Sequence, residues 1–189
     1  YNRHIKNGGI MTESPETLNT HAIELASKGN FAEAIACFKR AISMENSNYL
    51  LWYNLGVTYR DSGNLQAAKQ VLLTAYKLDN TDEELLDSLT LVCFALDETD
   101  DAFEYCSENI EINPENPHAW NNLGVLYFAR GEYRKAETAF EQAVSLYPHY
   151  YDALYNLRDT YAELGNTVGQ DECARLMAQL RNKGNYPNA

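Results

Sequence analysis

Five turn positions recur along this chain at intervals of 34 residues. They are Gly29, Gly63, Asp97, Gly131 and Gly165. Between these turns, apolar residues recur at spacings of three and four over segments of about a dozen residues, which is typical of amphipathic helices. The period therefore predicts that each unit is a pair of helices joined by a turn. Such units pack on their neighbours and do not surround one central core.

The second and fourth units share a longer motif. It reads Trp52-x2-Leu55-Gly56-x2-Tyr59, followed by Ala68, in one unit, and Trp120-x2-Leu123-Gly124-x2-Tyr127, followed by Ala136-x3-Phe140 and Pro148, in the other. These residues resemble the tetratricopeptide repeat family. The resemblance implies an all-α, right-handed superhelical solenoid of about five helix-turn-helix units.

The period also sets the expected organisation of the chain. Residues 1–14 are expected to be disordered or vector-derived, residues 15–182 to form the repeat domain, and residues 183–189 to be a frayed tail. The repeats are expected at 15–48, 49–82, 83–116, 117–150 and 151–182. In the last of them Arg158 replaces a small packing residue, which indicates a terminal unit that caps the array.

In the family, the first helices of the repeats line an inner groove that commonly holds an extended peptide or a partner helix. The resemblance implies that residues at fixed distances after the tryptophan phase line this groove. They are Tyr53, Asn54, Val57, Arg60, Asp87, Leu91, Phe94, Asn121, Asn122, Val125, Phe128, Tyr155 and Asn156, with Asp159 at a matching phase.

Three of these residues, Asn54, Asn122 and Asn156, share one phase. An amide side chain both donates and accepts hydrogen bonds, so a row of amides can pair with a peptide backbone of any sequence. The same amides can instead bond a neighbouring helix. The sequence leaves both interpretations open.

The third repeat, 83–116, is unusual in its charge. It contains eleven acidic residues and no lysine or arginine, and so holds nearly all of the net charge of −12. We expect an acidic patch here that attracts a basic partner and repels nucleic acid, although a solvated outer face is the alternative. Its predicted members are Glu84, Asp87, Asp97, Glu98, Asp100 and Asp101.

The third repeat is also unusual in its packing residues. Cys93 and Cys106 stand where the fourth repeat has large aromatic residues. Phe94, Phe103 and Tyr105 could refill the lost volume from adjacent phases. We expect this repeat to be the softest part of the array.

Little in the sequence points to catalysis or metal binding. Cys37, Cys93, Cys106 and Cys173 are expected to be reduced core thiols of a cytoplasmic protein, with a Cys93–Cys106 disulfide as the alternative. The chain shows no C-x-x-C spacing, no nucleophile–histidine arrangement and no glycine-rich phosphate loop. We therefore expect no enzyme, no catalytic residues, no metal and no cofactor.

The function that these features predict is that of a non-enzymatic interaction scaffold. The inner wall lacks the cluster of Lys, Asn and Arg with which some family members hold an acidic chaperone tail. The expected ligand is therefore a peptide or helix of another protein, with basic or apolar-aromatic character. Neither nucleic acid nor membrane insertion is expected. The alternative is a structural protein that assembles with copies of itself.

Overall fold

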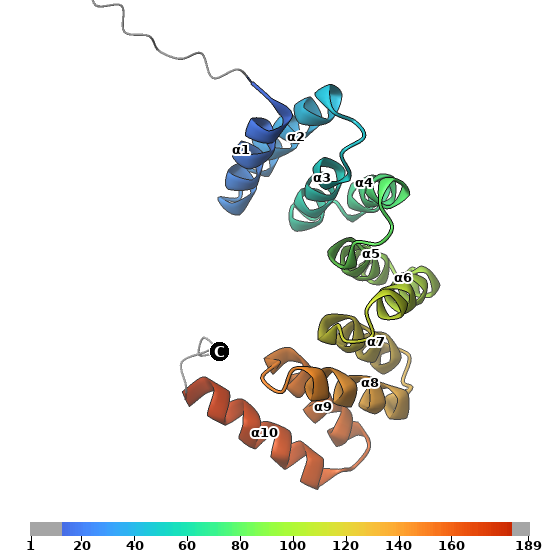
Figure 1. Cartoon of the computed structure of the whole chain (residues 1–189). Coiled ribbons are helices and arrows are strands. Elements are labelled where there is room, and N and C mark those ends of the chain that lie inside the picture. Colours follow the sequence, from blue (N-terminus) through green and yellow to red (C-terminus); the bar gives the residue numbers. More distant parts are fainter. Residues whose placement is uncertain (1–12, 183–189) are drawn as a thin grey trace, which may run out of the picture. The chain divides into compact units, whose positions relative to one another are not determined.

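The computed structural model describes residues 13–182, which form ten α-helices and no strand. The chain divides into two compact units, Tyr1–Leu78 and Asp79–Ala189. The first unit contains α1 (Pro15–Ser27), α2 (Phe31–Met44), α3 (Tyr49–Asp61) and α4 (Leu65–Leu78) (Figure 1). The second contains α5 (Glu83–Ala95), α6 (Thr99–Ile112), α7 (Pro117–Ala129), α8 (Tyr133–Leu146), α9 (Tyr151–Glu163) and α10 (Thr167–Asn182). The predicted all-α fold of helix pairs is confirmed.

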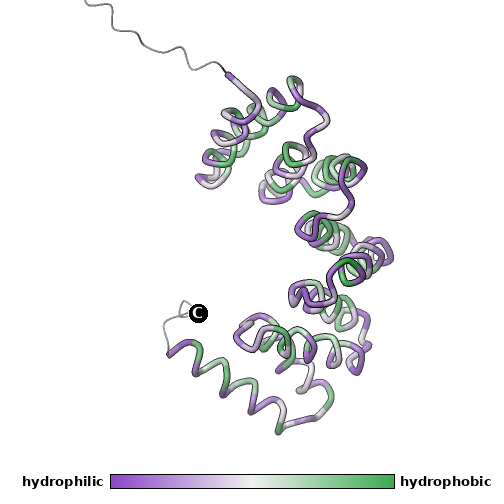
Figure 2. Tube along the Cα trace, viewed as in Figure 1, coloured by the Kyte–Doolittle hydropathy of each residue, from purple (hydrophilic) through white to green (hydrophobic). Residues whose placement is uncertain are grey.

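Packing follows the order of the chain within each unit. Each helix contacts the next one, and in the second unit the first helices of successive repeats also touch, α5 with α7 and α7 with α9. Figure 2 shows hydrophobic and hydrophilic residues alternating around the helices, as expected when one face is buried. The expected domain boundaries stay a prediction, and most of the two predicted terminal segments, 1–12 and 183–189, lies outside the described residues.

A polar residue begins the first helix of four repeats. These N-caps again recur every 34 residues, and their side-chain oxygens accept hydrogen bonds from backbone N–H groups of the first helical turn. They are Ser14, Asn48, Asp82 and Asn116. Tyr150 occupies the fifth position and makes no such bond. The start of each of these four helices is therefore encoded by one residue of the repeat.

The turn inside each repeat requires a left-handed backbone conformation. Gly29, Gly63, Gly131 and Gly165 have φ angles between 70° and 83°. Asp97 occupies the same position in the third repeat with φ 60° and is the single non-glycine residue with positive φ in the described chain. Because L-residues are destabilised in this region, Asp97 holds its turn at a conformational cost that glycine does not have.

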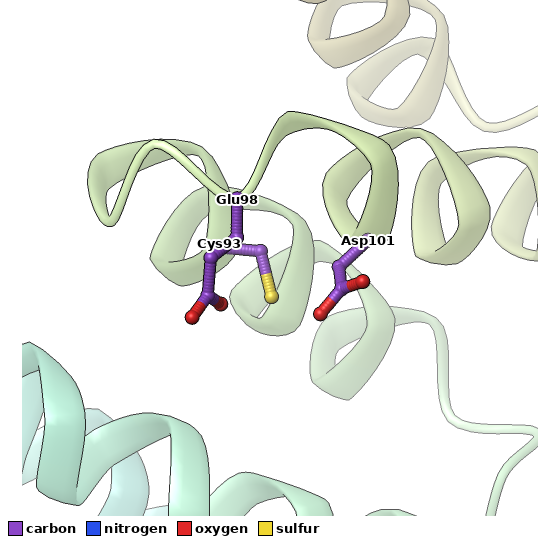
Figure 3. Close-up of side chains that lie close together, drawn as sticks. All are labelled: Cys93, Glu98 and Asp101. Atoms are coloured by element: carbon purple, nitrogen blue, oxygen red, sulfur yellow. The ribbon is translucent and has the colours of Figure 1, made fainter.

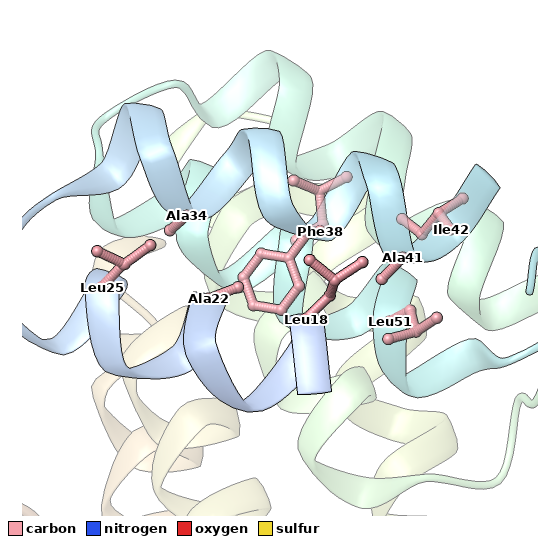
Figure 4. Packing of buried hydrophobic residues seen from close by; sticks show 9 residues of the cluster. Leu18, Ala22, Leu25, Ala34, Phe38, Ala41, Ile42 and Leu51 are labelled. Carbon is pink, nitrogen blue, oxygen red and sulfur yellow. The ribbon is translucent and has the colours of Figure 1, made fainter. Parts of the chain in front are cut away.

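Within a repeat, a small residue on the first helix faces a large residue on the second. A Cβ atom added at Gly124 would lie 2.5 Å from the ring of Phe140, and one added at Gly56 would lie 2.5 Å from Leu72. In the first repeat Ala22 and Phe38 hold the corresponding places, and both are buried (Figure 4). The two helices can approach closely because the small side chain on one helix leaves room for the large side chain on the other.

In the third repeat the two facing residues have different sizes from those in the other repeats. Thr90 and Cys106 occupy the two phases, so a larger residue on the first helix accompanies a smaller one on the second, and both are buried. Three aromatic residues, Phe94, Phe103 and Tyr105, pack against the cluster that contains Cys93 and Cys106. The aromatic refilling considered from the sequence is thus observed. The reduced stability of this repeat stays a prediction.

We expect Asp97→Gly to stabilise the protein by up to about 1 kcal/mol, because glycine adopts the left-handed turn without the cost carried by Asp97. The reverse change in the next repeat, Gly131→Asp, serves as the matched control. No atom lies within 4 Å of a Cβ added at Gly131, so the cost there is conformational, without a steric clash. Chemical denaturation of both variants measures the effect. A destabilised Asp97→Gly protein would contradict the argument.

Gly124→Ala should destabilise the protein by about 1–3 kcal/mol, because the added methyl group overlaps the ring of Phe140. The double variant Gly124→Thr/Phe140→Cys copies the pair found in the third repeat. Its cost should be smaller than the sum of the two single costs, because the residues share one volume. Thermal and urea unfolding test this, and strictly additive costs would show that the two positions are independent.

Candidate functional site

The predicted groove residues lie on the first helices of four repeats. Four of them are on α3 in the first unit, and nine are on α5, α7 and α9 in the second. All but one keep some exposure to solvent. The exception is Asn121, whose exposed fraction is 7%. Asn121 is therefore a packing residue and not an open part of the inner face.

The asparagine row forms hydrogen bonds between successive repeats. The Nδ2 atom of Asn54 donates to Asn19 Oδ1 at 2.9 Å, and that of Asn156 donates to Asn121 Oδ1 at 3.0 Å. Asn122 makes the equivalent bond to Asp87 Oδ1 at 3.1 Å. Each donor thus bonds a side chain 35 residues earlier in the chain. The sequence left open whether these amides pair with a peptide backbone or bond a neighbouring helix. The contacts support bonding to a neighbouring helix, at least for the amide nitrogen.

Asp87 is the one acidic acceptor among these three hydrogen bonds, and it is partly buried. Its Oδ1 atom accepts hydrogen bonds from Asn109 Nδ2 at 2.9 Å and from Asn122 Nδ2. Burial raises the pKa of Asp87 to about 6, although the charge of His118 and the two amide donors oppose the rise. The carboxylate is therefore charged near neutral pH in an environment that disfavours the charge.

Glu83, one turn before Asp87, joins three segments of the second unit. Its carboxylate accepts hydrogen bonds from Asn113 Nδ2 at 3.0 Å and from Asn116 Nδ2 at 2.9 Å. Its backbone carbonyl accepts a bond from Asn109 Nδ2 at 3.0 Å. The start of α5 is thus tied to α6 and to the loop before α7. Neither Glu83 nor Asn109 was predicted to have this role, since no sequence pattern indicates such a long-range pairing.

The predicted acidic patch divides into two groups. Glu84 and Asp87 lie near the beginning of α5, whereas Asp97, Glu98 and the first turn of α6 lie beyond its end. A helix of this length separates the groups by roughly 15 Å. The second group includes Asp100 and Asp101, whose charges are favourable at the N-terminus of α6. Part of the charge excess therefore stabilises helix ends.

Figure 3 shows Cys93, Glu98 and Asp101 close together at the α5–α6 turn. Their potential metal-ligating atoms all lie within 4.8 Å of one another, and Cys93 is buried. Each of the three residues also has another interaction within the chain. The expectation that the chain binds no metal stays a prediction, because no further feature of this turn points to an ion.

A cavity of about 220 Å³ opens on the first helices of the second unit. We call it the aromatic pocket and define it by its lining, which is Phe94, Val125, Phe128, Ala129, Phe140, Asn156 and Asp159. The structure thus brings four of the predicted groove residues together, Phe94, Val125, Phe128 and Asn156, with Asp159. Phe140 was missed as a lining residue because it comes from a second helix. Its pairing with Gly124 is the signal that could have found it.

Exposed apolar side chains stand beside the aromatic pocket. Leu91 is 43% exposed and lies one turn before Phe94 on α5. Tyr155 is 44% exposed, and the guanidinium of Arg158 stacks on its ring at 4.4 Å from the centroid. Arg158 also pairs with Asp159 at 2.7 Å. This face therefore combines apolar contact area with a small number of polar groups, the usual composition of a binding site.

Asp87→Asn should increase the free energy of unfolding by about 1–3 kcal/mol at pH 7.5. The raised pKa means that the protonated carboxyl favours the folded state. The stabilising contribution of the protonated Asp87 carboxyl is complete below about pH 4, and it is lost as the pH rises through about 6. The advantage of the variant should therefore shrink as the pH falls from 7.5 to 4, which urea unfolding across this range measures.

Glu84→Gln is the matched control for this change, because it removes the same charge from an exposed position on the same helix. We expect it to alter stability by less than about 0.5 kcal/mol. A gain from Asp87→Asn that does not vary with pH would show that burial of the charge is not its cause.

Two models of the tetratricopeptide repeat match the chain, at residues 19–83 and 117–150. A model of the protein prenyltransferase alpha subunit repeat matches residues 99–129. None of the helices between residues 13 and 182 has both the length and the apolar character needed to cross a membrane.

Curated relatives share part of this sequence. Cilia- and flagella-associated protein 70 from Homo sapiens is 27% identical over 121 residues, which is 62% of this chain and 11% of that protein. Photosystem I assembly protein Ycf3 from Rippkaea orientalis is 27% identical over 100 residues, which is 51% of this chain and 58% of that protein. The chain thus spans less than two thirds of the length of either relative.

Among solved structures, the MamA protein superimposes with a TM-score of 0.75 at 26% identity, covering 95% of this chain and 98% of that one. Together the two matches to tetratricopeptide repeat models cover just over half of the residues, and they fall on helix pairs with the period of 34. The chain belongs to the tetratricopeptide repeat family.

Proposed function

We propose that this protein is a non-enzymatic scaffold that binds a peptide or helix of another protein on the first helices α5, α7 and α9. The aromatic pocket is the observation that carries the proposal. Its lining is mainly apolar, and exposed Leu91 and Tyr155 extend the apolar area beside it. Exposed apolar surface next to a cavity is typical of a protein interaction site.

The chemistry of the buried thiols favours a scaffold over an enzyme. Burial raises the pKa of Cys106 to about 12 and that of Cys173 to about 11. Both are therefore protonated at neutral pH, and a thiol in this state is a poor nucleophile. Cys106 also donates to the carbonyl of Ala119 at 3.3 Å, a packing role. We also propose a cytoplasmic location, on the prediction that the cysteines are reduced.

The comparisons supply limited support for a role in assembly. The relative from Rippkaea orientalis is named as an assembly protein of photosystem I. Repeat arrays of this family type present extended surfaces made from successive units. We propose a general role of this kind for the present chain, with a protein segment as ligand and without nucleic acid or membrane insertion.

Site-specific photo-crosslinking tests this proposal in cells of the source organism. A benzophenone amino acid replaces Tyr155 on α9 and, in a second variant, Tyr147 after α8. The two positions form a matched pair, because both are tyrosines with an exposed fraction of 44%. We expect crosslinks to another protein from position 155 and few or none from position 147.

The other outcomes are equally informative. Crosslinks from position 147 alone would place the interface at the loop between α8 and α9 and contradict the proposal. Crosslinks that join two copies of this chain would favour self-assembly, the alternative function. Light scattering over a range of protein concentrations then measures the mass of the assembly.

A further inference from the structure

The size of the aromatic pocket limits what it can receive. An apolar cavity of about 150 Å³ is sufficient to bind benzene. At about 220 Å³ the aromatic pocket can therefore hold one ring or one branched aliphatic side chain, but not two rings. The binding element is thus a single side chain that anchors a longer segment.

The lining favours an aromatic anchor. Phe94, Phe128 and Phe140 come from three different helices and contribute three rings to one cavity. Ring pairs in tilted or offset arrangements gain stability beyond the burial of apolar area. Phe140 is 1% exposed and cannot move away from its place beside Gly124, so the inner end of the pocket is fixed.

The charges around the pocket favour a cationic neighbour of that anchor. The three helices α5, α7 and α9 carry six acidic residues, one arginine (Arg158) and one histidine (His118), and Arg130 directly follows α7. Asp159 lines the pocket itself. Arg158 bonds one carboxylate oxygen of Asp159, Oδ1, by two nitrogen atoms. This pairing leaves the second oxygen, Oδ2, able to accept from a cation of the partner.

We propose that the aromatic pocket receives one aromatic side chain from a partner segment that carries a lysine or arginine within a few residues of it. This inference rests on the proposed function and specifies the ligand of the same face. The ring fills the cavity lined by α5, α7, α8 and α9. The cationic group pairs with Asp159, and the surrounding negative charge speeds the encounter and disfavours acidic segments.

Selection from a random peptide library displayed on phage tests the inference with the full chain as bait. We expect the enriched peptides to combine one aromatic residue with a nearby Lys or Arg. Fluorescence anisotropy of the synthesised peptides then gives Kd for each variant. Val125→Trp fills the cavity and should weaken binding at least about tenfold, whereas Val168→Trp, at a position on α10 that is 80% exposed, should change Kd less than about twofold.

Two further variants separate the parts of the proposal. Asp159→Asn should weaken binding of a Lys-containing peptide about threefold and leave the Lys→Gln peptide unchanged, because only the first peptide loses a charge pair. Val125→Ala enlarges the cavity and should shift preference from phenylalanine towards tryptophan. This second measurement keeps the inference testable if Val125→Trp does not fold, which circular dichroism would show.

The outcomes distinguish this inference from the proposed function. Enriched peptides that lack the aromatic–basic pair, or that bind Val125→Trp as tightly as the unchanged protein, would overturn the inference while keeping a peptide-binding scaffold. A selection that enriches no peptide above an unrelated bait would count against both.

Discussion

The close approach of the two helices in each repeat is the constraint on which the structure depends. At Gly56 and Gly124 the neighbouring side chain fills the space that a Cβ atom would need. This contact sets the distance between the helices, and in the fourth repeat it also places the ring of Phe140 at the inner end of the aromatic pocket. Packing within one repeat thus shapes a surface that can be used for recognition.

A second set of contacts joins one repeat to the next through polar side chains. Amides on α3, α7 and α9 donate to oxygen atoms on the preceding first helices. At the junction of the third and fourth repeats the acceptor is Asp87, and burial raises its pKa. The same position therefore serves the connection between repeats and lowers stability near neutral pH. Such a compromise is common where surface residues also hold a structure together.

The period of 34 and the Trp-Leu-Gly-Tyr motifs were sufficient to predict the helix pairs, because turn glycines and helical periodicity are local signals. They also placed the predicted groove residues on the first helices, since helix phase determines which side chains share a side. That these residues bind a ligand stays a prediction. The partner of each asparagine and the burial of Asp87 were not predictable, because they depend on distances between repeats. Phe140 was missed because only the first helices were expected to line the groove, although its pairing with Gly124 in the same repeat could have indicated it.

The hydrogen bonds that asparagine side chains make between repeats also have the same direction at each junction. Asn54, Asn122 and Asn156 all donate through nitrogen, and within residues 13–182 their side-chain oxygens receive no hydrogen bond. Asp159 is likewise able only to accept when it is ionised. Asn54 in the first unit, and Asn122, Asn156 and Asp159 in the second, therefore keep an acceptor oxygen that receives no hydrogen bond from residues 13–182. A segment bound on these helices, as we propose, would meet these oxygens with donors such as the N–H groups of an extended backbone, so the proposed recognition would depend on the direction of hydrogen bonding as well as on charge.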